Sequence, residues 1–291
     1  MILVVQNVPM NIVLALLVLF AAIAAVTAIV AAVLRSKTSD AQVDARRRIR
    51  VMYGTAAILG LIFAALALAL FPVTTPVPGV LIAVAPSLAG IVFVIAATVG
   101  ESFWPVPKGQ QRGAFLTRRP MFANAGPMWA VITWAVLLVF ALVFFGFAAM
   151  PDGRSLAHPV WNPAVTGSSG PFPGWPYGIP ILICSAVLVA LTLYGLRTIA
   201  RRPAVSGISP DVDAQLRHTS ATNLVKGVQF SFAVSLGGVL MVAGTAGSNA
   251  GIVDVDGYFA TLAGHWWAYP AMTLAVVTII VATIVAVWKQ K

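Results

Sequence analysis

Long apolar stretches separated by short polar ones recur along the whole chain. Each is close to the roughly 20 residues that a helix needs to cross about 30 Å of hydrocarbon. Their interiors contain no Asp, Glu, Lys, Arg or His. The pattern predicts an all-α, polytopic integral membrane protein with seven transmembrane helices, at about 11–34, 51–71, 79–99, 128–149, 179–197, 227–246 and 268–288. We expect these helices to form a single transmembrane domain over residues 1–291.

The first apolar stretch is interpreted as a retained helix rather than as a secretory signal. It has no basic segment in front of it, and it is longer than the roughly 7–15 apolar residues of a signal peptide.

Positive charge is confined to alternate connections between the predicted helices. Every Lys and Arg except Arg154 lies in or at the edge of the loops 35–50, 100–127 and 198–226, or in the C-terminal tail. The loops 150–178 and 247–267 are nearly free of positive charge. Basic loops stay in the cytoplasm, so we expect the N-terminus outside, the C-terminus inside and an odd number of spans.

Composition supports the same class of protein. Hydrophobic residues make up 60% of the chain and charged residues 9%, whereas soluble domains are nearer half apolar and a quarter charged. The net charge of +10 would suggest nucleic-acid binding in a soluble protein. Because the cations lie in short loops, we expect the lipid bilayer as a partner and no nucleic acid. The single Cys184 allows no intrachain disulfide and is interpreted as a small buried hydrophobe.

The loop 198–226 contains a sequence signal for the start of a helix. Ser209, Pro210 and Asp211 have the order of an N-cap, a first-turn proline and a first-turn acid. No helix breaker follows until Gly227, so we predict a short surface helix leading into the sixth span, and the alternative is a docking helix for a cytosolic partner. Its apolar positions would face lipid or protein; they are Val212, Leu216 and Leu224.

The sixth span carries a face of small residues, which includes Ser235, Gly237, Gly238 and Gly244. Small residues let helix backbones approach closely. The face predicts close packing inside the bundle, or alternatively an interface with another copy or a partner. In the third span, Pro86 predicts a kink.

The segment "GPFPGWPYGIP", residues 170–180, ends the longest external loop. Its prolines argue against helix, so we expect the fifth span to enter through Pro180 in its first turn. The segment is either an anchor at headgroup depth or a rigid lid that packs near His265 and Trp267. An external binding vestibule would use the aromatic residues on this side, which are Trp161, Phe172, Trp175, Tyr177, His265 and Trp266.

Motifs of catalysis and cofactor binding are absent from the sequence. It contains no G-x-S-x-G, no H-E-x-x-H and no Walker A motif. The external histidines, His158 and His265, lie in different loops without the spacing of metal ligands. We therefore expect no catalytic residue, no metal site and no cofactor. The uncharged spans also argue against an ion-coupled pump or a channel with a charged ring.

Three loop sequences resemble one group of proteins. They are "GPFPGWPYGIP", "RTIARRPAVSGISPDVDAQLRHTSATNLVKG" and "GESFWPVPKGQQRGAFLTRRP". Together they look like a loose group of uncharacterised multi-span membrane proteins of high-GC actinobacteria. The resemblance implies a bacterial plasma membrane and carries no activity.

Three functions are compatible with these observations. The first is a non-enzymatic membrane subunit, an accessory or permease-type component of a transporter or another multi-protein complex, with other subunits or further copies of itself as partners. The alternative is a receptor or sensor that binds a small molecule or lipid at the external face. The third is an interfacial enzyme that uses His158, His265 or the external aspartates.

Overall fold

In a computed structural model, the described part of the chain forms a bundle of six long helices. The structure describes residues 40–69, 79–104, 128–157, 168–205, 208–250, 252–255, 258–261 and 265–287. The helices are α2 (Ala41–Ala69), α3 (Val80–Ser102), α4 (Met128–Ala148), α5 (Trp175–Arg201), α6 (Pro210–Asn249) and α7 (Ala268–Val287). Within the described part of the chain, six helices are long and apolar enough to cross a membrane. The chain is therefore an all-α, multi-pass membrane protein. The predicted span at 11–34 lies outside the described residues.

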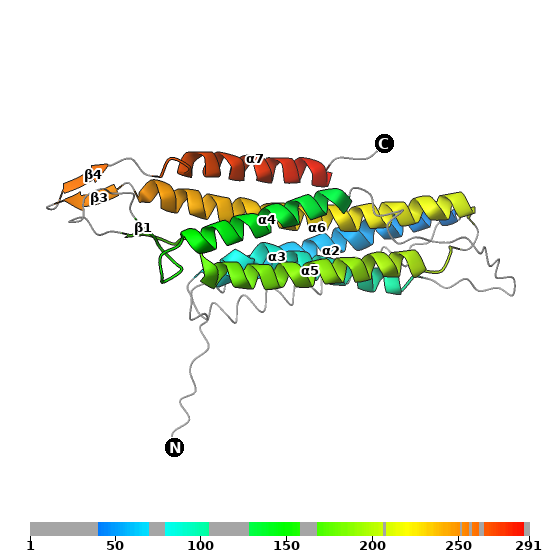
Figure 1. Ribbon diagram of the computed structural model, residues 1–291. Coiled ribbons are helices and arrows are strands. Elements are labelled where there is room, and N and C mark those ends of the chain that lie inside the picture. The colour runs from blue at the N-terminus through cyan, green and yellow to red at the C-terminus, as the bar shows by residue number, and fades with distance from the viewer. Residues whose placement is uncertain are drawn as a thin grey trace, which may run out of the picture.

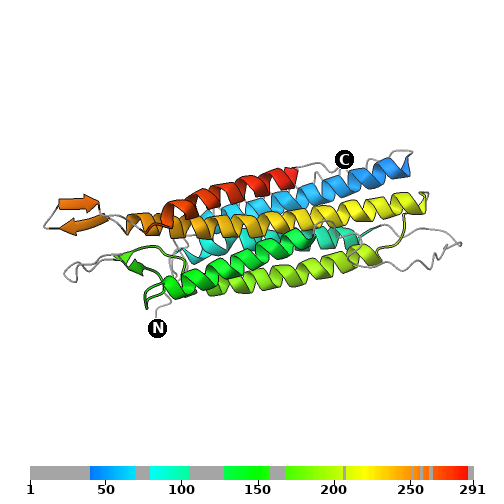
Figure 2. The same cartoon turned by 45° about the horizontal axis from the view of Figure 1, so that its top comes forward.

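The helices alternate in direction, which gives the bundle two distinct ends (Figure 1). At one end α2 and α6 begin and α3 and α5 end; we call it the basic end, because the arginines of these four segments gather there. At the other end lie two short strand pairs, and we call it the hairpin end. A rotated view shows the same separation (Figure 2). The alternation agrees with the predicted separation of basic and non-basic loops.

The hairpin end carries the two antiparallel pairs. β1 (Leu156–Ala157) pairs with β2 (Ser168–Ser169), with Leu156 opposite Ser169. β3 (Ile252–Val255) pairs with β4 (Tyr258–Thr261), with Ile252 opposite Thr261. Both pairs lie in segments that the sequence predicted only as external loops.

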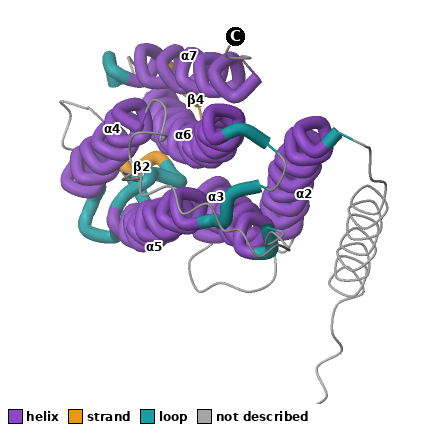
Figure 3. Tube along the Cα trace, turned by 90° about the vertical axis from the view of Figure 1, so that its right-hand side faces the viewer, coloured by secondary structure: helices purple, strands orange, loops and turns teal. Residues whose placement is uncertain are grey.

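α6 is the central helix and contacts α2, α3, α4, α5 and α7 (Figure 3). Its 40 residues span about 60 Å, twice the thickness of the hydrocarbon layer. The predicted cap is confirmed, since the Ser209 hydroxyl accepts a hydrogen bond from the Val212 backbone N–H at 3.4 Å. The predicted short helix is the first part of this one continuous helix. Leu216 and Leu224 are buried in the protein core.

Two other helices are longer than their predicted spans. α2 begins at Ala41, within the predicted loop 35–50, and the Asp40 carboxylate accepts a hydrogen bond from the Gln42 N–H at 2.8 Å. α5 begins at Trp175, so the expected entry at Pro180 is wrong. Pro176 occupies the first turn, where a missing N–H leaves no intrahelical bond unmade, and Pro180 lies inside the helix. α3 likewise runs through Pro86 without a break.

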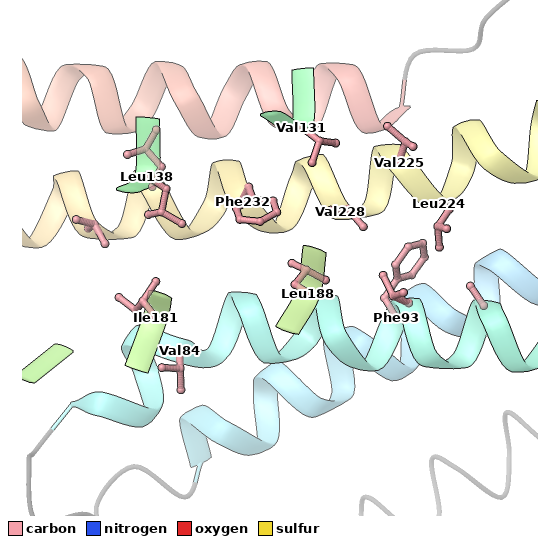
Figure 4. Close-up of a cluster of buried hydrophobic side chains, with 14 of the residues drawn as sticks. Val84, Phe93, Val131, Leu138, Ile181, Leu188, Leu224, Val225, Val228 and Phe232 are labelled. Atoms are coloured by element: carbon pink, nitrogen blue, oxygen red, sulfur yellow. The ribbon is translucent and has the colours of Figure 1, made fainter. Parts of the chain in front are cut away.

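The core lies between α3, α4, α5 and α6. Side chains from these four helices share one interior (Figure 4), among them Phe93, Leu138, Leu188 and Phe232. α6 meets α3 through polar contacts as well. The Ser231 hydroxyl donates to the Pro86 carbonyl at 2.7 Å, and the hydroxyls of Ser87 and Ser235 are 3.1 Å apart.

The small-residue face of α6 divides between the inside and the outside of the bundle. A Cβ at Gly237 would lie 2.7 Å from Cγ1 of Ile279, and one at Gly244 would lie 2.8 Å from the Ala268 carbonyl oxygen, both in α7. Real Cβ atoms do not approach that closely, so these glycines allow α6 and α7 to touch. Gly238 differs, because it is exposed and no atom lies within 4 Å of where its Cβ would be.

Candidate functional site: a buried arginine–glutamate cluster at the basic end

A buried ion pair joins α3 to the residue that follows α5. Nη1 of Arg202 donates to Oε2 of Glu101 at 3.0 Å, and the two side chains are 0% and 1% exposed. Glu101 belongs to the last turn of α3, and Arg202 is the C-cap of α5. The sequence had assigned Glu101 to a loop. The structure corrects this assignment and places a buried carboxylate inside a membrane-spanning helix.

Residues from two further helices complete the cluster. The Tyr53 hydroxyl of α2 donates to Oε1 of Glu101 at 3.4 Å. From α6, the Ser220 hydroxyl lies 3.3 Å from Nη1 of Arg202. The cluster therefore connects α2, α3, α5 and α6 at one level of the basic end.

An aromatic ring covers the buried guanidinium. Cζ of Arg202 lies 4.1 Å from the ring centroid of Trp104, and Cζ of Arg48 lies 5.3 Å from it. Arg48 also donates to the Phe103 carbonyl at 2.8 Å, just after the end of α3. Cation–π contacts of this kind gain strength when the cation is desolvated. Trp104 is itself only 4% exposed.

The electrostatics explain why this pair must stay together. A carboxylate at the C-terminus of a helix faces the negative end of the helix dipole, and burial adds the loss of hydration. Arg202 compensates both effects at Glu101. Glu101 compensates the burial of Arg202 only in part, because Nε and Nη2 of Arg202 are buried and have no hydrogen-bond partner among the described residues.

A second buried pair closes the end of α5. Nε of Arg217 donates to Oδ2 of Asp213 at 2.8 Å, one turn apart on α6. Nη1 of Arg217 donates to the carbonyls of Ile199 and Ala200, at 3.1 Å each. The last carbonyls of a helix have no partner within it, so Arg217 caps α5 from the neighbouring helix.

A pocket of about 570 Å³ opens beside the cluster, between the last turns of α3 and α5. Its lining holds three arginines and one carboxylate. The lining residues are Glu101, Ser102, Tyr194, Arg197, Thr198, Arg201, Arg202 and Pro203. Chemically, the pocket is an electropositive site at one end of an apolar bundle.

The hairpin end is organised by aromatic packing. Phe172 is fully buried, with ring centroids 5.6 Å from Phe145 and 6.4 Å from Trp267. Trp175 packs edge-on against Phe147 at 5.4 Å. The expectation that residues 170–180 pack near Trp267 thus agrees with the structure.

The loop 150–178 also contains a carboxyl with a shifted pKa. Hydrogen bonds from the Arg154 backbone and from Ser155 lower the pKa of the Asp152 carboxyl.

The described residues among those predicted for an external vestibule differ in burial. Phe172 lies inside the aromatic packing and Tyr177 is buried at the start of α5, whereas Trp266 is 85% exposed. His265 contacts the loop 150–178, with Nε2 3.0 Å from the Ala157 carbonyl. Trp161 and His158 lie outside the described residues.

Sequence reasoning missed the cluster at the basic end, although one signal for it was present. In α3 the buried positions include Ser87, Gly90, Val94 and Ala97, and Glu101 continues this spacing. A carboxylate on the inward stripe of a helix needs a buried partner. Nothing in the sequence identifies Arg202 as that partner, because its neighbours Arg197 and Arg201 have the same chemistry.

The chain matches no known protein family, no characterised protein and no solved structure.

Proposed function

We propose that this protein is a non-enzymatic integral membrane subunit of a multi-protein membrane complex, as an accessory or permease-type component. We further propose seven spans in a bacterial plasma membrane, with the N-terminus outside and the basic end in the cytoplasm. The observation that carries the proposal is α6, a 40-residue helix that is buried over most of its length and is joined to the end of α5 by Ser220 and Arg217.

The paired charges favour a structural role over a catalytic one. Glu101 and Asp213 are each buried against an arginine. Ion pairs of this kind fix the relative positions of helices, and removal of one partner leaves an uncompensated buried charge.

Helix lengths support the proposed orientation. α4 and α7, with 21 and 20 residues, match about 30 Å of hydrocarbon. α2, α5 and α6 extend beyond them at the basic end (Figure 1). Because positive residues are retained in the cytoplasm, this extension would stand on the cytoplasmic side as a rigid helical platform.

The receptor alternative receives less support from the geometry. Its vestibule requires aromatic side chains that converge on an opening at the hairpin end. Phe172 instead packs in the interior beneath that end, and Trp266 is exposed to its surroundings. These positions fit anchoring and closure better than ligand capture.

Affinity purification in a mild detergent tests the proposal. We expect the tagged chain to elute with a stoichiometric partner or a second copy, identified by mass spectrometry and by the mass of the particle. A chain that elutes only as a 30.5 kDa monomer from cells that express it at native level would contradict the proposal.

A further inference from the structure

The pocket at the basic end carries an excess of positive charge that the bundle itself does not use. Arg197 and Arg201 are exposed on the last turns of α5, and neither forms an ion pair with a described residue. Glu101 is already paired with Arg202. Three arginines against one carboxylate therefore leave the pocket electropositive.

Capping of α5 does not explain these arginines. Basic residues often gather at helix C-termini, where they compensate the free carbonyls and the dipole. Here Arg217 of α6 already donates to the carbonyls of Ile199 and Ala200. Arg197 and Arg201 thus have positive charge available for a ligand.

Arg202 supplies the second, independent observation. Its Nη1 is occupied by Glu101 and Ser220, whereas Nε and Nη2 are buried without a partner among the described residues. Buried donors without acceptors are costly. Arg202 also lines the pocket.

The surroundings of the pocket favour phosphate. Tyr194 is 61% exposed in the pocket wall, one turn before Arg197. An exposed tyrosine followed by arginines is typical of the headgroup level of a bilayer. Basic pockets between transmembrane helices bind the phosphates of lipid headgroups. The volume of this pocket, about 570 Å³, is large enough for one phosphate group.

We propose that this pocket binds a phosphate group, with Arg197 and Arg201 as its exposed ligands and with Arg202 as a buried positive charge beside them. The group is the headgroup of an anionic phospholipid or the phosphate of a soluble molecule. Binding is a property of the isolated chain, so it stands or falls separately from assembly into a complex.

The test compares two double variants of the purified full chain. Arg197→Gln with Arg201→Gln removes two charges from the pocket. Arg46→Gln with Arg50→Gln removes two exposed charges from α2 at the same end, outside the pocket lining. Binding of phosphatidylglycerol in mixed micelles, with phosphatidylcholine as reference, and of inorganic phosphate is measured by native mass spectrometry and by the shift in Tm.

We expect the pocket variant to weaken binding roughly 10-fold or more and the α2 variant to leave it within about two-fold. Loss with phosphatidylglycerol alone identifies a lipid headgroup, and loss with inorganic phosphate identifies a soluble ligand. Equal loss in both variants would show a diffuse electrostatic attraction, and no loss in either would leave the pocket without a ligand. Either of these results overturns the proposal.

Discussion

At the scale of single residues, the protein depends on a few buried charges in an otherwise apolar bundle. Glu101 and Arg202 lose their hydration on folding, and each is the main compensation of the other. The pair is contacted by Tyr53, Ser220 and Trp104, which come from three separate segments of the chain. Removal of one partner is therefore costly, because it leaves the other charge buried and uncompensated.

Glu101→Gln should destabilise the bundle strongly, since it leaves the Arg202 guanidinium buried and unpaired. The expected loss is about 3–5 kcal/mol, the range for breaking a buried pair from one side. It is measured as a lower Tm of the purified protein in detergent.

The double variant Glu101→Gln with Arg202→Met provides the control for this experiment. It removes both charges, so it should recover a large part of the lost stability. Additive losses from the two single substitutions would show that the two residues contribute independently, against the role of the pair described above.

At the scale of elements, hydropathy predicted the apolar part of each described helix better than the full length of that helix. α4 and α7 are apolar from end to end, and their predicted bounds agree with the structure within about two residues. α2, α5 and α6 continue into polar or proline-containing segments, such as the arginine run after Ala41 and the turn at Pro176. Hydropathy detects burial in lipid, whereas these extensions are stabilised by neighbouring helices.

The candidate site was less predictable because contacts between helices, which hydropathy does not detect, determine it. Glu101 follows the inward spacing of α3, so its burial could be derived from the sequence. The choice of Arg202 as partner depends on where the chain leaves α5, and on Arg217 of α6 capping that helix. These are contacts between segments far apart in the chain, and no local pattern encodes them.

Two neighbouring glycines of α6 test the packing of elements. Gly237→Leu should lower the Tm by several degrees, because its side chain would displace Ile279 and separate α6 from α7. Gly238→Leu should leave the Tm unchanged or slightly higher, since the space beside Gly238 is open and leucine favours helix. Equal Tm values for the two variants would contradict the α6–α7 contact described above.

At the scale of the whole molecule, the two ends of the bundle differ in chemistry. The basic end contains the buried ion pairs and the electropositive pocket. The hairpin end contains packed aromatic rings and two short strand pairs. The proposed orientation places the basic end in the cytoplasm, where positively charged loops are retained.

The orientation can be measured with single cysteines in a background where Cys184 is replaced by serine. Gln215→Cys places a thiol on the exposed face of α6 at the basic end, and Arg154→Cys places one in the exposed turn at the hairpin end. A membrane-impermeant maleimide is applied to intact cells and to permeabilised cells. We predict labelling of the Arg154→Cys variant in intact cells and of the Gln215→Cys variant only after permeabilisation. Labelling of Gln215→Cys in intact cells, with Arg154→Cys protected, would reverse the orientation and contradict the account.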